Sequence, residues 1–291
     1  MGIRLIALDM DGTVLLDDHL TVTPAVQLAM QKAVKRGVLV VPATGRVAAM
    51  LPRVFLEMEG IRYVINSNGA SVWDRVENRV IYTNPMPAEV VQRILKILEP
   101  YGLLTQIYCG GKIYAEKRSL KRVNDLPFTA AFIENIRKTQ IELESFQALL
   151  QGHPEGVEKL NLAHVEPELR KKLWRQFEEI PEISVVSSAG SNIELNCAGA
   201  SKGDALCHLC ESLGIVPGEV MAIGDSGNDV ECCNMQITRL LWITVQRKRR
   251  RLRSIAPPPM RRMGWPVRSN DSSNCDVKAV APSPIEACGS P

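Results

Sequence analysis

A short apolar run near the N-terminus ends in two aspartates that are separated by one residue. Residues 3–8 read IRLIAL, and Asp9, Asp11 and Gly12 follow. The run predicts a buried strand, and residues two apart on an extended chain project to the same side. Asp9 and Asp11 can therefore face one point at the carboxyl end of a sheet, where open α/β sheets bind ligands. A strand that ends in an Asx turn would explain Asp11 and Gly12, but not Asp9.

Residues 1–83 alternate between strand and helix patterns. Thr23 and Pro24 are typical of a helix start, and Gly37 is typical of a helix end. Further patterns predict strands at 38–41 and 62–66, a helix at 47–58 and a hairpin at 71–82. This order predicts an α/β fold in which helices cover both faces of a parallel sheet.

The order of elements changes after a proline-containing hinge at residues 84–87. We expect a separate α/β domain at 84–190, inserted between a first core segment (1–83) and a second one (191–231). Its predicted elements are helices at 88–98 and 167–179 and strands at 104–108, 112–115, 159–163 and 183–187. A strand at 193–196 is expected to lead back to the core.

Three further polar motifs follow apolar runs or open a helix pattern. Thr44 follows the second apolar run, Lys202 opens a helix pattern, and Asp225, Asn228 and Asp229 follow a later apolar run. Each motif alone is more often a helix cap, a solvated lysine or a turn. Together with the first two aspartates, they form four motifs in a fixed order.

These four motifs resemble those of the haloacid dehalogenase superfamily. The segment DMDGT at 9–13 resembles its nucleophile motif, and the long insertion before Lys202 is similar to the mixed α/β cap of the Cof-type branch, subfamily IIB. The resemblance covers residues 1–231. It implies a Rossmann-like parallel core with an inserted cap, and a phosphatase that hydrolyses small phosphorylated metabolites. Sugar phosphates are the substrates that the resemblance favours.

The resemblance also implies catalytic roles. Asp9 would attack phosphorus to form an aspartyl phosphate, and Asp11 would protonate the leaving group and then deprotonate the hydrolytic water. Thr44 would donate a hydrogen bond to a phosphoryl oxygen, and Lys202 would neutralise its charge.

A carboxylate can attack a phosphate dianion only where its charge is screened, and two neighbouring carboxylates need a cation or a shared proton. Mg²⁺ is the expected cofactor because it prefers a few hard oxygen ligands. The implied ligands are Asp9, the backbone carbonyl of Asp11, and Asp225. Asp229 would orient Asp225 or a bound water, or ligate the metal directly.

Five residues are candidates for substrate binding. Backbone N–H groups around Gly45 can add to a phosphate cradle. Arg46 is either a cation that faces the substrate or a surface residue. Asn68 and Gly69 are expected to touch the substrate beneath the cap, and Asn228 belongs to the last acidic motif.

Composition excludes several other classes of protein. No apolar run approaches the about 20 residues that span a bilayer, and the N-terminal residues do not resemble a signal peptide. We therefore expect a cytoplasmic protein without a membrane partner. Cys207 and Cys210 have a zinc-like spacing, but no second pair completes a site. The 4 histidines form no cluster in the sequence, and nothing there indicates an oligomeric state.

Residues 232–291 differ from the rest of the chain. They contain 11 basic and 3 acidic residues and 7 of the 18 prolines, whereas the remainder contains 24 basic and 29 acidic residues. We expect an irregular tail without hydrophobic periodicity. A basic tail can bind nucleic acid, and such a protein is the least favoured alternative.

A shifted reading frame explains the tail better. We chose allowed codons for 231–253 and inserted one base after codon 231. The new frame encodes an amphipathic helix, a strand, a turn and a second helix, which resembles the continuation usual in the family. The arginine-rich run at 247–253 would then be an out-of-phase translation. DNA sequencing of the locus tests this hypothesis. An inactive or unstable product is the runner-up to the phosphatase, because an unfinished core exposes apolar surface and sheet edges.

Overall fold

The computed structural model describes residues 2–188, 190–225 and 227–229. Our expectations for residues 232–291, including the shifted frame, lie outside the described residues. Among the residues that the structure describes, every helix is too short or too polar to cross a membrane.

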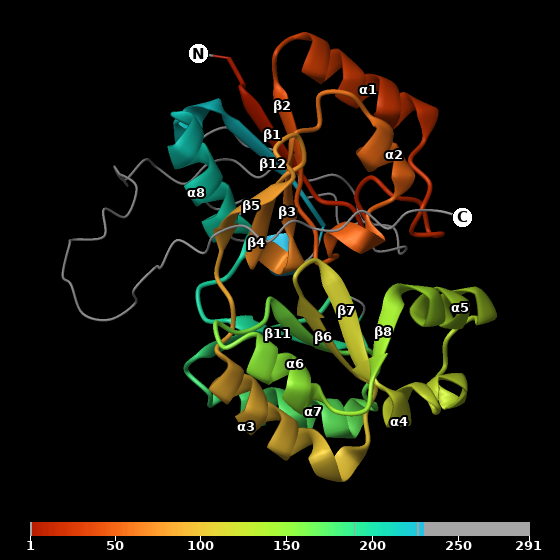
Figure 1. The fold of residues 1–291 in the computed structure, drawn as a ribbon. Helices are drawn as coiled ribbons and strands as arrows, with labels where there is room; N and C mark the ends of the chain where they lie inside the picture. The colour runs from red at the N-terminus through yellow and green to blue at the C-terminus, as the bar shows by residue number, and fades with distance from the viewer. Residues whose placement is uncertain (1, 189, 226, 230–291) are drawn as a thin grey trace, which may run out of the picture. The chain divides into compact units, whose positions relative to one another are not determined.

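The core contains the parallel sheet that the sequence predicts (Figure 1). Strand β1 (Leu5–Leu8) lies between β12 (Val220–Ile223) and β2 (Leu39–Pro42), and both neighbours run parallel to it. The carboxyl ends of all three strands therefore meet at one edge of the sheet, and the motifs that follow each strand gather there.

Two long helices pack on the core strands, one on β2 and the other on the strands at residues 63–83. Helix α1 (Pro24–Lys35) begins at Thr23, whose hydroxyl accepts the Val26 N–H, and helix α8 (Lys202–Leu213) begins at Ser201, whose hydroxyl accepts the Asp204 N–H. These side chains satisfy N–H groups that have no partner within the helix.

The helix predicted at 47–58 is interrupted. The structure has a 3₁₀ turn η1 (Ala48–Met50) and a short α2 (Arg53–Glu57), separated by Leu51 with φ −68° and ψ 131°. Leu51 precedes Pro52, and the proline ring disfavours helical geometry in the residue before it.

The third strand, β3 (Tyr63–Asn66), belongs mainly to an antiparallel sheet with β4 (Ser71–Asp74) and β5 (Arg79–Thr83). One parallel bridge between Ala43 and Ile65 connects it to the end of β2. The hairpin prediction for 71–82 is confirmed. A 3₁₀ turn, η2 (Ser67–Gly69), follows β3.

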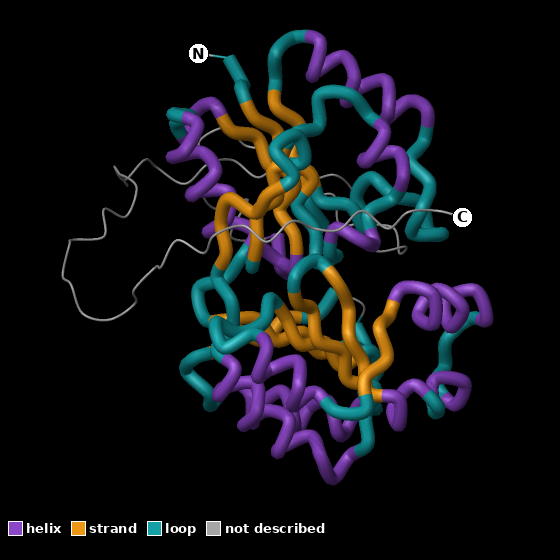
Figure 2. Tube along the Cα trace, viewed as in Figure 1, coloured by secondary structure: helices purple, strands orange, loops and turns teal. Residues whose placement is uncertain are grey.

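The inserted region forms a third sheet, which is mixed (Figure 2). Its strand order is β10-β11-β9-β6-β7-β8. The strands are β6 (Thr105–Cys109), β7 (Lys112–Glu116), β8 (Gln140–Leu143), β9 (Lys159–Leu162), β10 (Ile183–Val186) and β11 (Ile193–Cys197). The helices are α3 (Ala88–Leu98), α4 (Lys117–Leu120), α5 (Ala130–Thr139), α6 (Phe146–Gly152) and α7 (Pro167–Glu178).

The remaining 3₁₀ turns lie in both parts of the chain. They are η3 (Glu99–Tyr101), η4 (Val123–Asp125), η5 (Pro217–Glu219) and η6 (Gly227–Asp229).

The strand that we assigned to the second core segment belongs to this sheet. β11 pairs with β9 and β10 in the middle of the cap rather than with the core strands. The cap sheet therefore includes residues beyond the expected boundary at 190.

Strand β8 was not predicted. It is a four-residue segment that pairs parallel to β7.

The two faces of the cap sheet differ in polarity. Apolar side chains of β6, β9 and β11 pack in one hydrophobic cluster with α3, α6 and α7, which lie on one side of the sheet (Figure 1). On the other face, Gln106, Asn161 and Glu194 occupy paired positions across β6, β9 and β11. All three are buried, so this polar face is covered as well.

Candidate active site

Three aspartates come together at the carboxyl edge of the core sheet. Asp9 directly follows β1, whereas Asp225 and Asp229 follow β12. The Asp9 N–H donates to the Ile223 carbonyl at 2.8 Å, which holds the ends of the two strands together. One carboxylate oxygen of each aspartate lies within 4.8 Å of the others. The structure therefore brings together aspartates that are more than 200 residues apart in the sequence.

Lys202 reaches this cluster from the first turn of α8. Its Nζ donates to Asp9 Oδ1 at 2.6 Å and to Asp229 Oδ1 at 2.7 Å, and its side chain is completely buried. Burial would lower the pKa of Lys202, but the charges of the two carboxylates raise it above its ordinary value. Lys202 is therefore a fixed cation at the centre of the site.

Burial has the opposite consequence for Asp9. It raises the pKa of this carboxyl to about 6, against the lowering effect of the Lys202 charge, and the nearby Asp229 charge raises it further. An additional positive charge nearby would favour the ionised form of Asp9.

Glycines make room for the other two carboxylates. A Cβ at Gly12 would lie 2.4 Å from Asp225 Oδ2, and a Cβ at Gly224 would lie 2.3 Å from Asp229 Cγ. Gly12 also has a φ of +82°, which other residues rarely adopt. Any side chain at either position would push a carboxylate out of the cluster.

The cluster fits a divalent cation. Asp9 Oδ2 is buried and has no hydrogen-bond donor among the described residues. A buried carboxylate oxygen of this kind is costly unless a cation or a proton satisfies it. The nearby oxygens are carboxylates, which are the donors that Mg²⁺ prefers. Both oxygens of Asp229 already accept hydrogen bonds, Oδ1 from Lys202 and Oδ2 from the Asp225 N–H at 3.2 Å.

The Asp11 carboxylate is held outside this cluster. Arg46 donates to it through Nε at 2.8 Å and Nη2 at 2.6 Å, and His19 Nδ1 lies 2.8 Å from Oδ1. Burial would raise the pKa of Asp11, but the hydrogen bonds and charge of Arg46 hold it below its usual value. The surface alternative for Arg46 is therefore wrong: its side chain is only 13% exposed and binds within the core.

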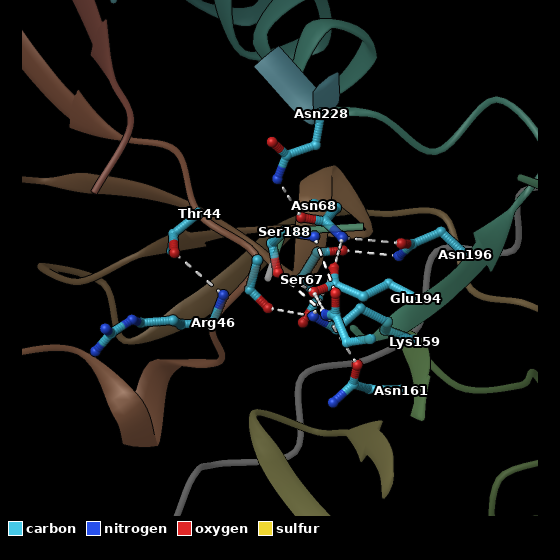
Figure 3. A network of polar contacts seen from close by, with 12 residues as sticks. Thr44, Arg46, Ser67, Asn68, Lys159, Asn161, Ser188, Glu194, Asn196 and Asn228 are labelled. Atoms are coloured by element: carbon cyan, nitrogen blue, oxygen red, sulfur yellow. Dashed lines mark hydrogen bonds and ion pairs between the residues drawn. The ribbon is translucent and has the colours of Figure 1, made fainter. Parts of the chain in front are cut away.

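Thr44 is buried at the end of β2. Its Oγ1 accepts the Arg46 backbone N–H at 3.1 Å (Figure 3). Because Oγ1 accepts this bond, the hydroxyl proton can be donated elsewhere.

Of the remaining predicted substrate residues, Gly45 lies between Thr44 and Arg46, and the others lie in the η2 and η6 turns. Asn68 Oδ1 accepts from Asn228 Nδ2 at 3.0 Å, and Asn68 Nδ2 donates to Glu194 of the cap (Figure 3). Asn68 thus joins the last acidic motif to the cap. Gly69 has a packing role, because a Cβ there would lie 2.0 Å from the carbonyl oxygen of Ser201.

Several residues of this network are not among the site residues that the sequence predicts. The cap contributes Glu158, Lys159, Glu194 and Asn196, all of which are buried and hydrogen-bonded to one another or to core residues. Figure 3 labels the last three of them. Strands β9 and β11 alternate polar with apolar residues, and this alternation was the available signal. His19 was also missed, since no sequence pattern places it beside Asp11.

The family comparison agrees with this geometry. A sequence model of the haloacid dehalogenase-like hydrolases matches residues 6–234. The chain belongs to this family. The match contains all four motifs and ends close to the point where the motif resemblance stops.

Similar proteins narrow the reaction class. Phosphatase YwpJ of Bacillus subtilis is 31% identical over 245 residues, which cover 78% of this chain and 84% of that protein. The phosphatase YcsE of the same organism, named for 5-amino-6-(5-phospho-D-ribitylamino)uracil, is 26% identical over 79% of this chain and 80% of its own length. A solved haloacid dehalogenase-like hydrolase from B. subtilis superposes with a TM-score of 0.68 at 26% identity, covering 80% of this chain and 87% of that one. These relatives place the chain among the phosphatases of the family.

Proposed function

We propose that this haloacid dehalogenase-like hydrolase is a Mg²⁺-dependent phosphatase that cleaves small phosphorylated metabolites through an aspartyl phosphate. The observation that carries the proposal is the contact of Asp9 with Lys202 inside a three-aspartate cluster. A nucleophilic carboxylate, a buried cation and a divalent-cation site are the groups that phosphoryl transfer requires.

The first half of the reaction forms the covalent intermediate. A carboxylate oxygen of Asp9 attacks phosphorus, and the bond between phosphorus and the ester oxygen breaks. Asp11 must first leave its ion pair with Arg46 and take up a proton, because the pair favours the ionised form. It then gives this proton to the departing alkoxide, which leaves as an alcohol. Thr44 donates a hydrogen bond to a phosphoryl oxygen, while Lys202 balances the charge on the phosphoryl group.

The second half releases phosphate. Water attacks phosphorus, Asp11 takes a proton from this water, and the bond between Asp9 and phosphorus breaks. Inorganic phosphate leaves, and Asp9 returns to its carboxylate form. Asp11 alternates between acid and base, as the two halves of the reaction demand.

Asp9, Asp225 and the backbone carbonyl of Asp11 would hold Mg²⁺. The ion, when bound, screens the negative charge of the substrate phosphate from the attacking carboxylate. Asp229 serves better as an orienting group than as a ligand, because Lys202 and the Asp225 N–H occupy its two oxygens.

We also propose a phosphorylated sugar or polyol as substrate, which is the class that the motif resemblance favours. The polar face of the cap does not select this class by itself, because Gln106, Asn161 and Glu194 are buried and hydrogen-bond one another or neighbouring side chains. The name of YcsE, which refers to a phosphoribityl group, supports the same class. The cytoplasmic location stays a prediction.

A phosphate-release assay on the full chain tests the proposal. We expect Mg²⁺-dependent hydrolysis of p-nitrophenyl phosphate, and faster hydrolysis of at least one member of a panel of hexose, pentose and polyol phosphates. Asp9→Asn should abolish turnover in every case. Turnover that persists in this variant would remove Asp9 from its role, and activity that is unaffected by chelation would remove the metal.

A further inference from the structure

The peptide group between Gly45 and Arg46 is held at both ends. The Gly45 carbonyl accepts from Lys159 Nζ at 2.6 Å, and the Arg46 N–H donates to Thr44 Oγ1 at 3.1 Å. A planar trans peptide directs its C=O and N–H to opposite sides. The two hydrogen bonds together therefore fix the rotation of this peptide plane, and one of them comes from the cap (Figure 3).

The neighbouring carbonyls do not depend on the cap. The Thr44 carbonyl accepts the Asn68 N–H at 3.0 Å, and the Arg46 carbonyl accepts the Ser67 N–H at 2.9 Å. Both donors are backbone groups of the core. Of these three successive carbonyls, Gly45 is the one that relies on the cap lysine.

The environment of Lys159 holds its ammonium group in place. The side chain is 2% exposed, Nζ lies 3.3 Å from Glu194 Oε2, and it lies 4.3 Å from the centre of the Tyr108 ring. A buried ammonium needs such partners. Glu194 in turn accepts from Asn68, so the lysine is anchored between cap and core.

We infer that Lys159 is a positioning residue for phosphate binding, because its hydrogen bond to the Gly45 carbonyl makes the orientation of the Thr44 hydroxyl depend on the cap. While Oγ1 accepts the Arg46 N–H, the Thr44 hydroxyl proton is directed toward the phosphate. Without Lys159, the half-buried Gly45 carbonyl loses its donor from the cap, and we expect the peptide plane to rotate toward another donor. Thr44 then loses the bond that orients it. This inference rests on the proposed function.

Binding of inorganic phosphate isolates this effect, since phosphate has no leaving group that the cap could recognise. Isothermal titration of the full chain with inorganic phosphate and Mg²⁺ gives the Kd. We expect Lys159→Met, which keeps the length but removes the donor, to raise this Kd at least tenfold. The control is Lys171→Met, which removes an exposed lysine of cap helix α7 and should leave the Kd unchanged.

A double variant separates positioning from direct contact. In a Thr44→Val background, where the hydroxyl is already absent, Lys159→Met should change the Kd less than twofold. An undiminished tenfold loss in that background would overturn the inference, because Lys159 would then act on phosphate or on the fold without Thr44. A wild-type Kd in the single Lys159→Met variant would overturn it as well.

Circular dichroism establishes whether each variant folds. If Lys159→Met does not fold, the Kd of Lys159→Arg for phosphate is measured instead. A Kd close to that of the wild type supports the inference, and a Kd raised tenfold overturns it. Failure of the proposed function looks different. A folded wild-type chain that neither binds phosphate nor releases it from esters would remove the function and this inference together.

Discussion

Arg46 and Asp11 form a bidentate ion pair, in which Nε lies 2.8 Å from Oδ2 and Nη2 lies 2.6 Å from Oδ1. The guanidinium group also donates to the backbone carbonyls of Met50 and His19. The pair is therefore tied to two loops, and it sets the place of the carboxyl group that we propose as general acid and base.

Arg46→Ala should impair proton transfer to the leaving group, because Asp11 loses the contacts that position it. The pKa of Asp11 would rise toward its usual value in this variant, but we expect the loss of position to dominate. We expect kcat to fall on the order of 10²-fold for an alkyl phosphate, which needs an acid. The loss for p-nitrophenyl phosphate should be much smaller, because nitrophenolate leaves without a proton. Steady-state kinetics with both substrates measure the difference. Arg53→Ala, at an exposed position of α2, serves as the control, and equal losses for both substrates would contradict the role of the pair.

Removal of the Lys202 charge should destabilise the chain. Lys202→Met leaves Asp9 and Asp229 close together without their buried cation, and breaking such a pair costs about 3–5 kcal/mol. Urea unfolding in the presence of a chelator measures this loss. Added Mg²⁺ should recover part of it, since a second cation can replace the first. A stability that matches the wild type in chelator would show that Lys202 does not compensate these carboxylates.

Mg²⁺ should also stabilise the unmodified chain. Binding to the folded state alone adds about 2.7 kcal/mol at a concentration of 100 times Kd, so the Tm should rise with Mg²⁺ and fall with a chelator. Asp225→Asn should greatly reduce this dependence. Glu89→Gln changes an exposed carboxylate of α3 and should retain it. A Tm shift that survives in Asp225→Asn would place the ion elsewhere.

Acid should weaken the contact between cap and core at Glu194. Burial would raise the pKa of Glu194, but the Lys159 charge and the hydrogen bonds from Ser188 and Asn68 hold it below its ordinary value. The ionised form therefore contributes stability that is complete above the unfolded pKa of about 4.3. This contribution is lost as the pH falls through the lower pKa of the folded state.

The matched variant for this pH effect is Glu194→Gln. The free energy of unfolding is measured for the wild type and for Glu194→Gln between pH 7 and pH 3. The difference between the two should be largest at pH 7 and should shrink toward pH 3. Glu89→Gln should give no such convergence. A constant difference between wild type and Glu194→Gln across this range would show that the charge of Glu194 contributes nothing.

The sequence was sufficient to predict the centre of the site. Asp9 and Asp225 each follow an apolar strand, and parallel strands end at the same edge of a sheet, so their proximity follows from the topology. The interruption at Leu51 could also have been predicted, because Pro52 follows it.

Other features depend on tertiary contacts that no local pattern contains. Alternation in β9 and β11 shows that one face is polar, but it does not show that Lys159 meets a core carbonyl or that Glu194 meets Asn68. The same limit applied to β11, which has the pattern of a core strand and pairs in the cap. The contact between His19 and Asp11 depends on the path of the loop that carries His19, and no local pattern in the sequence predicts that path.

The pairing of β1 with β12 has a consequence for synthesis of this protein. A ribosome makes Asp9 among the first residues and Asp225 more than 200 residues later, while the whole cap sheet lies between them. The cap can thus assemble on the nascent chain before its catalytic centre exists. Under the proposed function, translation must pass Asp229 before any phosphate ester can be cleaved.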